Sequence, residues 1–501
     1  MNLAGILEYS ARFFPERTAA ISQGREISYA SLNEEANRVA SGLARLNIRP
    51  GDSVAICQPN GITWIAAYFG ILKTGATAVT FFSGLSEAEL NQLLDDGRPR
   101  AIFMDPGRLS CLEVLRKKPY LENVICDHGD ISYEQLIETG QAEFRTIDRD
   151  RSDTAAILYT GGTTGRPKGA MLSHENILTS ACNVAVQERS TAEDRALCFL
   201  PLNHVFGQIH IMASTIYSAG SLIILPSFDL DEVLDCIRDY QVTKFYSVPT
   251  VYVRLLAVNG LKERLKSIRY CFSAAASMAQ ELVRKWKEVT GLSIYEAYGL
   301  TESASMVTYN HYNRHVVGSV GTPVGTVEVA IRDRKGKDLD TGQEGEICIR
   351  GLSIMKGYLN QPRATADAFW GAWFRTGDVG LLDEQGYLYI IDRIKDLIIT
   401  GGENVYPREV EELLYERFEV EECSVIGLPD PEYGERVTAV IVTRAGTKLN
   451  PAELKEFLKE RLSSYKVPKE FLSVDELPKN AAGKILKREL KKELHGLKSH
   501  R

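Results

Sequence analysis

The part of the chain richest in chemistry is the run Thr160-Gly161-Gly162-Thr163-Thr164-Gly165-Arg166-Pro167-Lys168-Gly169. Residues 155–158 before it are apolar and predict a buried strand, and Ser173 after it suits a helix cap, so we expect a loop between strand and helix. In such a loop, glycines let backbone N–H groups approach an anion, threonine hydroxyls donate hydrogen bonds, and a lysine adds positive charge. The spacing differs from a Walker loop, because a proline precedes the lysine and a glycine follows it. The run predicts a phosphate-binding loop, with a plain Gly/Thr surface turn as the alternative.

Five further polar motifs follow this loop along the chain. They are Tyr295-Glu296-Ala297-Tyr298-Gly299-Leu300-Thr301-Glu302, Trp373-Phe374-Arg375-Thr376-Gly377-Asp378, Asp392-Arg393-Ile394-Lys395-Asp396, Gly401-Gly402-Glu403-Asn404-Val405-Tyr406-Pro407 and Pro478-Lys479-Asn480-Ala481-Ala482-Gly483-Lys484. Together they resemble the adenylate-forming superfamily of acyl-CoA synthetases, nonribosomal peptide adenylation domains and firefly luciferase, over nearly the whole chain. The resemblance implies an enzyme that joins AMP to a carboxylate, expels pyrophosphate, and then lets a thiol displace the AMP. Because the first step brings two anions together, electrostatic stabilisation and positioning must supply most of the catalysis.

The resemblance also implies a role for each motif in binding ATP. The residues implied to hold the β- and γ-phosphates are Thr160, Gly161, Gly162, Thr163, Thr164, Gly165 and Lys168. Those implied to contact the α-phosphate, adenine and ribose are Thr301, Glu296, Ala297, Tyr298, Asp378 and Arg393. Glu302 is implied to bind Mg²⁺, a hard ion that prefers oxygen ligands. Lys484 is implied to bridge the substrate carboxylate and the α-phosphate, which makes Lys484, Thr301 and Glu302 the candidate catalytic residues.

The thioester step with CoA is implied to use the C-terminal part of the chain. Lys395 matches the hinge about which the family rotates its small C-terminal domain between the two half-reactions. Gly401 and Gly402 would then wall the pantetheine tunnel, where a side chain would obstruct the thiol. A plain turn is the alternative interpretation of these two glycines.

A third set of residues is implied to bind the acid. It consists of His204, Val205, Phe206, Tyr246, Ser247, Val248, Ala274, Ala275, Gly299 and Met306. The set is mostly apolar, and a second buried charge without a partner is costly, so we expect fatty or aryl monocarboxylic acids rather than dicarboxylates or amino acids. A bulkier side chain at Ala274 or Gly299 is expected to shorten the accepted acid. The sequence favours an AMP-forming acid–CoA ligase, and an adenylating enzyme that loads a carrier-protein pantetheine or an amine is the alternative.

The elements that position these motifs alternate between helix and strand. Ser31 begins a pattern typical of a helix cap, Ser53–Cys57 and Thr77–Phe82 suggest strands, and Trp64–Leu72 suggests a helix, which together favour parallel sheets covered by helices. Residues 320–391 contain short strands separated by Gly and Asp turns, which predicts an antiparallel or barrel-like element. We therefore expect an α/β fold with a large N-terminal domain, 1–392, and a small mobile α+β domain, 393–501.

Composition excludes several other classes of protein. The 501 residues are 44% hydrophobic and 25% charged, which is typical of globular proteins. A net charge of −7 argues against a general nucleic-acid surface, and no apolar run approaches the length of a membrane span. The nine cysteines are scattered without a C-x-x-C pair, which fits a reducing compartment, and we expect a cytoplasmic protein. A homodimer and a carrier-protein partner stay open at this point.

Overall fold

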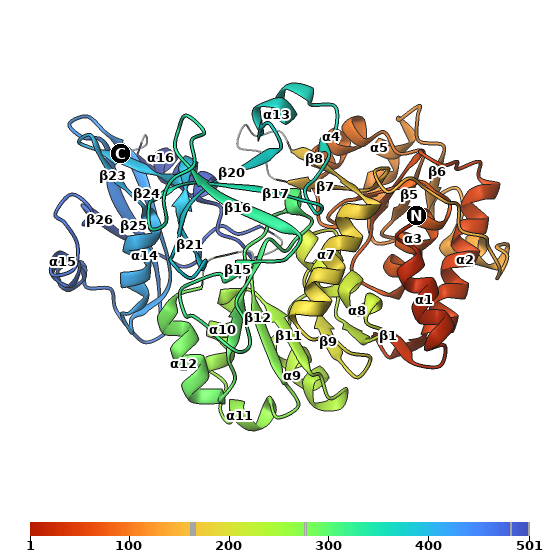
Figure 1. Ribbon diagram of the computed structural model, residues 1–501, viewed down its shortest axis with the longest axis horizontal. Helices are drawn as coiled ribbons and strands as arrows, with labels where there is room; N and C mark the ends of the chain where they lie inside the picture. Colours follow the sequence, from red (N-terminus) through yellow and green to blue (C-terminus); the bar gives the residue numbers. More distant parts are fainter. Residues whose placement is uncertain (161–166, 275, 277, 481–482, 499–501) are drawn as a thin grey trace.

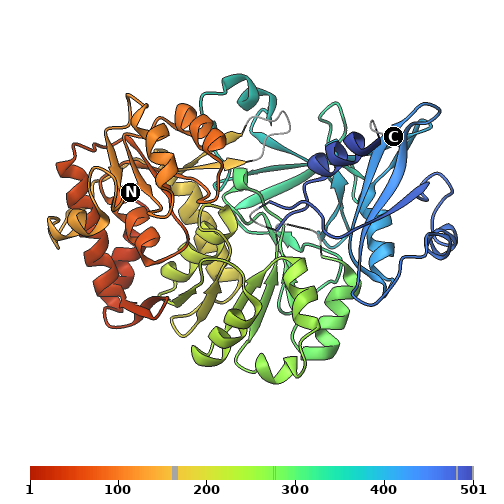
Figure 2. The ribbon, with the colours of Figure 1, turned by 180° about the vertical axis from the view of Figure 1, so that it is seen from behind.

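The computed structural model describes residues 1–160, 167–274, 276, 278–480 and 483–498 (Figure 1). It has the expected mixed α/β architecture, in which sheets are covered by helices. The C-terminal residues form a smaller unit at one end of the molecule, and the N-terminal helices lie at the opposite end (Figures 1 and 2). In the described part of the chain, no helix is both long enough and apolar enough to cross a membrane.

The first sheet has the strand order β6-β5-β3-β4-β7-β8-β18 and is parallel from β6 to β7. Its strands are β3 (Ser53–Cys57), β4 (Thr77–Thr80), β5 (Ala101–Met104), β6 (Asn123–Ile125), β7 (Thr154–Thr160), β8 (Lys168–Ser173) and β18 (Gly357–Tyr358). Nearby helices are α2 (Tyr29–Arg45), α3 (Ile62–Lys73), α4 (Glu87–Gly97), α5 (Leu112–Arg116) and α6 (Tyr133–Glu138). The buried faces of α2 and α3 pack together, which explains the apolar residues on both.

The second sheet has the order β2-β1-β10-β9-β11-β12-β13 and is parallel except for the edge strand β2. Its strands are β1 (Thr18–Ser22), β2 (Arg25–Ser28), β9 (Arg195–Cys198), β10 (Ser221–Ile224), β11 (Lys244–Ser247), β12 (Tyr270–Ser273) and β13 (Ile294–Glu296). The helices around it include α1 (Gly5–Phe13), α7 (His174–Gln187), α8 (Ser214–Tyr217), α9 (Leu230–Asp239), α10 (Pro249–Leu256), α11 (Leu261–Arg264) and α12 (Gln280–Thr290). Because the strands are parallel, the motifs that follow β11, β12 and β13 emerge at one edge.

An antiparallel sheet follows, as the short strands between 320 and 391 predict. It contains β16 (Val327–Arg332), β17 (Gly345–Gly351), β19 (Phe369–Trp370), β20 (Trp373–Leu382) and β21 (Leu388–Arg393). The pair β14 (Thr308–Tyr309) and β15 (Thr322–Pro323) precedes it, and α13 (Pro362–Asp367) lies before β19.

The C-terminal unit has a sheet and a core of its own. Its strands are β22 (Ile398–Thr400), β23 (Glu403–Val405), β24 (Val420–Asp430), β25 (Gly434–Thr443) and β26 (Glu470–Val474), and its helices are α14 (Pro407–Tyr415), α15 (Pro451–Lys459) and α16 (Lys487–Lys498). Apolar side chains such as Ile398, Val410, Val425 and Leu454 are fully buried among one another in this unit. A separate core is what an independently moving domain requires, although the boundary at 392/393 stays a prediction.

Two local predictions were wrong. The first long helix, α2, starts at Tyr29 rather than after Ser31, because the Ser28 hydroxyl accepts a hydrogen bond from the Ser31 N–H at 3.2 Å and caps it. The glycine-rich run does not join a strand to a helix. It joins β7 to the antiparallel strand β8, whose Lys168 is the register partner of Thr160. The predicted cap at Ser173 is confirmed, since its hydroxyl accepts from the Asn176 N–H and α7 begins at the next residue.

Candidate functional site

The first group of site residues lies where the β7–β8 hairpin opens. Thr160 ends β7 and Lys168 begins β8, and Gly161, Gly162, Thr163, Thr164 and Gly165 lie outside the described residues. The Lys168 ammonium lies 4.8 Å from the ring centre of Tyr358, and a pocket of about 650 Å³ opens beside both, with Arg375 and Thr376 on its wall. Arg375 is paired with Glu346 at 2.9 Å in the same wall, so Lys168 is the lining cation that lies at the predicted phosphate-binding run.

Glu302 lies next to this pocket, in the short 3₁₀ helix Thr301–Ser303. Its Oε1 accepts a hydrogen bond from the Tyr358 hydroxyl at 2.8 Å. Burial raises the pKa of the Glu302 carboxyl, and the bond from Tyr358 only partly opposes this effect. A carboxylate that is withdrawn from water and held by a neutral donor is suited to a cation, which would lower its pKa again.

Asp378 joins two other predicted residues. It is 4% exposed, its Oδ2 accepts from the Tyr298 hydroxyl at 2.6 Å, and its Oδ1 lies 3.0 Å from Nε of Arg393. The motifs around 298, 378 and 393 come from the end of β13, from β20 and from β21, so the fold brings together residues that are far apart in sequence. Each carboxylate oxygen keeps a second lone pair, which can accept a ligand hydroxyl.

Glu296 and Ala297 precede Tyr298 at the end of β13. The Glu296 carboxyl is buried, and its Oε2 has no hydrogen-bond partner. Burial raises its pKa to about 8, against the attraction of Arg408 on α14. Its side chain thus lies close to the C-terminal unit, and the predicted contribution to an adenine pocket rests on the backbone.

Lys484 is the point at which the C-terminal unit reaches this site. The residue is partly buried, and its pKa is lowered to about 8 by removal from water and then by the charge of Arg393, against the opposing effect of Asp378. Lys484 also acts on His204, whose pKa burial and then this ammonium lower to about 4. The neighbouring Gly483, at φ 80°, places its Cα close enough to Val248 that a Cβ would lie 3.0 Å from the valine methyl. The charge of Lys484 therefore acts both on the Asp378–Arg393 pair and on His204, which is one of the residues predicted to bind the acid.

The residues predicted to bind the acid come from three segments. His204, Val205 and Phe206 lie at the start of the buried π-helix η2 (Phe206–Ala213), Tyr246 and Ser247 end β11, and Gly299 and Met306 flank the 3₁₀ helix at 301–303. Val248 and Ala274 follow β11 and β12, and Ala275 lies outside the described residues. Since side chains alternate along a strand, Tyr246 and Ser247 point to opposite faces, and Ser247 does not share the surface of Tyr246. Its Oγ is buried without a partner.

The expectation that a bulkier residue at Gly299 shortens the acid stays a prediction, and the backbone nearby leaves no space for an added side chain. A Cβ on Gly299 would lie 1.4 Å from the carbonyl oxygen of Ser305 and 3.3 Å from Cα of Met306. A side chain there would displace the backbone before it filled any pocket. The glycine is required by close approach of two chain segments.

The predicted residues for the thioester step lie in the C-terminal unit. Lys395 is exposed in the 3₁₀ helix η4 (Ile394–Asp396), which directly follows β21 and leads into that unit. Gly401 and Gly402 form the exposed turn between β22 and β23, with φ angles of 58° and 85° that favour glycine.

Sequence reasoning missed a buried charged group next to the acid residues. Glu188, Lys244 and His210 are each 4% exposed or less, and the His210 ring lies 5.3 Å from Phe206 and 5.7 Å from Tyr246, measured between ring centres. Tyr358, which holds Glu302, was also missed. No local sequence pattern indicates the buried charged group or Tyr358, because their partners come from separate elements of the fold.

Comparison with known proteins agrees with this geometry. Residues 7–359 match the AMP-binding enzyme family, and residues 409–484 match the AMP-binding enzyme C-terminal domain. The chain is 35% identical to a long-chain-fatty-acid–CoA ligase of Bacillus subtilis, over 98% of this chain and 94% of the relative. It is 34% identical to a feruloyl-CoA synthase of an Amycolatopsis species, over 96% and 97%. The crystal structure of ATP-bound MatB from Rhodopseudomonas palustris superposes with a TM-score of 0.92 at 34% identity, over 98% of this chain and 99% of that one. The chain belongs to the AMP-binding enzyme family and is an adenylate-forming acid–CoA ligase.

Proposed function

We propose that this enzyme uses MgATP to convert a fatty or aryl monocarboxylic acid into an acyl-adenylate and then transfers the acyl group to the thiol of CoA. The observation that carries the proposal is the charge of Lys484, which acts both on His204 and on the Asp378–Arg393 pair. A positive group there faces both reactants of the first step.

In that step a carboxylate oxygen attacks the α-phosphorus, and the bond to pyrophosphate breaks. Lys484 would offset the charge that collects between the carboxylate and the α-phosphate, with Thr301 beside it. Asp378 would accept from the ribose hydroxyls, Tyr298 would lie against adenine, and Lys168 with Thr160 would hold the outer phosphates. Glu302 would hold Mg²⁺, which supplies charge neutralisation at the phosphate oxygens when bound.

In the second step the CoA thiolate attacks the acyl carbonyl carbon, and AMP leaves. For this step, residues 393–501 would rotate about Lys395 into another orientation. In that orientation Gly401 and Gly402 would take the place of Lys484 in the active site. The separate core of the C-terminal unit supports such motion, because the unit can turn without unpacking itself. The two glycines carry no side chain into the path of a thiol.

The acid class is supported by the chemistry of the pocket residues and by the relatives. Val205, Phe206 and Met306 are buried and apolar, and the named relatives act on a long-chain fatty acid and form feruloyl-CoA. The nine cysteines are all free thiols, which supports a reducing compartment such as the cytoplasm.

The test is ATP–pyrophosphate exchange over a panel of acids, followed by thioester formation with CoA, with a phosphopantetheinylated carrier protein, or with an amine. We expect acid-dependent exchange and an acyl-CoA product. Exchange with transfer only to the carrier protein or to the amine would reject CoA as the acceptor. The absence of exchange with any acid would reject the proposal itself.

A further inference from the structure

The C-terminal unit contacts the rest of the molecule at the start of α12 (Figure 1). Helix α12 begins at Gln280, and Ala279 at its N-cap makes no side-chain hydrogen bond to the first turn. Glu412 on α14 supplies the missing acceptor, because its Oε2 accepts a hydrogen bond from the Gln280 N–H at 3.3 Å. The helix dipole favours a carboxylate at this end of a helix. Glu412 therefore links the unit that carries Lys484 to α12.

A second carboxyl faces the same contact from the end of β13. Glu296 is 6% exposed, and its Oε2 has no hydrogen-bond partner among the described residues. The cation that acts on it is Arg408 of α14, whose Nε lies 3.4 Å from Oε1 of Glu412. Arg408 also donates through Nη1 to the Ile390 carbonyl at 2.6 Å. One guanidinium therefore serves two carboxyls, one from each side of the contact.

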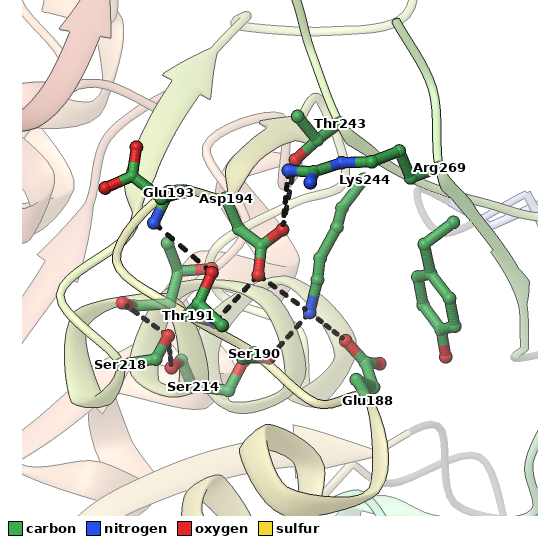
Figure 3. Close-up of polar contacts among 12 residues, drawn as sticks. Glu188, Ser190, Thr191, Glu193, Asp194, Ser214, Ser218, Thr243, Lys244 and Arg269 are labelled. Atoms are coloured by element: carbon green, nitrogen blue, oxygen red, sulfur yellow. Dashed lines mark hydrogen bonds and ion pairs between the residues drawn. The ribbon is translucent and has the colours of Figure 1, made fainter. Parts of the chain in front are cut away.

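A buried carboxylate elsewhere in the protein shows how the fold neutralises such a group. Glu188 is fully buried, and its Oε2 lies 3.2 Å from the Lys244 ammonium (Figure 3). Its Oε1 lies 2.7 Å from Nε2 of His210. Burial would raise the pKa of Glu188, but the charges of Lys244 and His210, with hydrogen bonds from His210 and Tyr246, lower it overall. Glu296 has no comparable set of partners, so the contact between the two units lacks one positive charge.

The acids next to this contact have partners of their own. Glu411, beside Glu412 on α14, lies 2.8 Å from the Lys487 ammonium. Asp392 accepts a hydrogen bond from the Arg408 N–H at 2.9 Å. In the described part of the chain, no lysine or arginine other than Arg408 forms an ion pair with Glu412. The shortage of positive charge is therefore confined to the pair of carboxyls at the contact.

The pKa values of both carboxyls follow from this shortage. Burial raises the pKa of Glu296 to about 8, against the attraction of Arg408, and the charge of Glu412 adds to the rise. Burial also raises the pKa of Glu412, against the attraction of Arg408 and the hydrogen bond from Gln280. Near pH 7 the closed contact keeps a proton on the pair, whereas two carboxyls in water would both be ionised.

We infer that Glu412 is a positioning residue, which seats the C-terminal unit in the orientation that places Lys484 in the active site. Rotation of the unit would break the bond from Gln280 and separate Glu412 from Glu296, so that the retained proton passes to water. The inference rests on the proposed function, which supplies the rotation. Because the closed contact binds one proton more than the open one, it is most stable below about pH 4.5. It weakens by up to about tenfold per pH unit until about pH 8, so rising pH favours the rotated orientation.

The first test removes a single donor. Gln280→Pro deletes the N–H that Glu412 accepts, and proline suits this position because Gln280 is the first residue of α12 and Ala279 before it has a ψ of 133°. Gln280→Ala is the matched control, since it removes the same side chain and keeps the N–H. Relative to this control, Gln280→Pro should slow ATP–pyrophosphate exchange by about fivefold and leave thioester formation from a supplied acyl-adenylate at least as fast. Equal activities of the two variants, or equal losses in both half-reactions of Gln280→Pro, would overturn the inference.

The second test follows the proton. Both half-reactions are measured at pH 6 and pH 8 for the unaltered enzyme, for Glu412→Gln and for the control Glu416→Gln. Glu416 directly follows α14, one turn beyond Glu412, and is exposed. Each rate is divided by that of the unaltered enzyme at the same pH, which removes the ionisation of Lys484 and of the CoA thiol from the comparison.

Glu412→Gln leaves a single carboxyl opposite Arg408, so its closed contact no longer needs the proton. Its relative ratio of exchange to thioester formation should rise by at least about tenfold between pH 6 and pH 8, and that of Glu416→Gln should stay constant. A constant ratio in Glu412→Gln, or the same rise in Glu416→Gln, would overturn the inference and leave the ligase function standing. No exchange by the unaltered enzyme with any acid would instead reject the proposed function. If Glu412→Gln does not fold, the two Gln280 variants decide.

Discussion

Replacing Lys484 by alanine tests the central proposal most directly. The ammonium is the group that acts on both the Asp378–Arg393 pair and His204, so its removal should affect the step that joins two anions. Removing one preorganised charge-stabilising group lowers a rate by about 10²–10³, or about 2.7–4 kcal/mol. We expect that loss in ATP–pyrophosphate exchange, and a much smaller change in thioester formation from a supplied acyl-adenylate.

The pKa of Lys484 adds a pH dependence to this prediction. A value of about 8 leaves roughly nine-tenths of the lysine protonated at pH 7 and roughly one-tenth at pH 9. Because the charged form is the active one, kcat/KM for exchange should fall as pH rises through about 8. Lys484→Arg stays charged throughout this range, so its slower exchange should lack that fall. Equal and mild losses in both half-reactions of Lys484→Ala, or the same pH profile in Lys484→Arg, would refute the assignment.

Three further predictions concern the hinge, the metal and the domain contact. Lys395→Pro should leave ATP–pyrophosphate exchange nearly intact and abolish acyl-CoA formation, because proline fixes φ near −65° where the backbone must rotate; normal overall turnover would exclude Lys395 as the hinge. Glu302→Gln should raise the Mg²⁺ concentration required for half-maximal exchange by about tenfold or more, whereas an unchanged Mg²⁺ titration would remove Glu302 from the metal site. As pH rises from about 4.5 to about 8, the melting temperature of Glu296→Gln should increase relative to that of the unaltered protein. Across that range the folded state keeps the proton that the unfolded state has lost, so folding becomes less favourable with rising pH until Glu296 ionises. If the melting temperatures of the variant and of the unaltered protein change equally between pH 5 and pH 8, this prediction is refuted.

Local signals in the sequence were sufficient for several elements. The cap at Ser173 and the prolines that begin α14 and α15 mark helix starts, because a cap or an N1 proline acts within one turn. The start of α2 was misplaced by three residues because both Ser28 and Ser31 suit a cap, and only the burial of Tyr29 decides between them. The strand β8 was missed because six residues with a lysine and a glycine carry little β propensity, and pairing with β7 stabilises them.

Contacts between residues far apart in the chain could not be predicted from the sequence. Lys244 and Glu188 are 56 residues apart, and nothing near either residue indicates that both are buried. The hydroxyl of Tyr358 reaches Glu302 from the two-residue strand β18, which no periodicity can reveal. The collision at Gly299 depends on the path of Ser305 six residues later, where the φ of 100° on a serine is set by tertiary packing. Motifs identify which residues act, whereas the shape of the acid pocket follows from packing.

Helix α7 has a consequence for how this enzyme could acquire new substrates. It starts directly after the strand that carries Lys168, and Glu188 caps its other end. Its 14 residues span about 21 Å and pack against β7, β8 and η2. Because α7 packs against the strands that carry Thr160 and Lys168, we expect mutations at Glu188 to be epistatic with those in the nucleotide site. The π-helix Phe206–Ala213 packs against α7, and its His210 contacts Glu188, so we expect substitutions there to be epistatic with those in α7 as well.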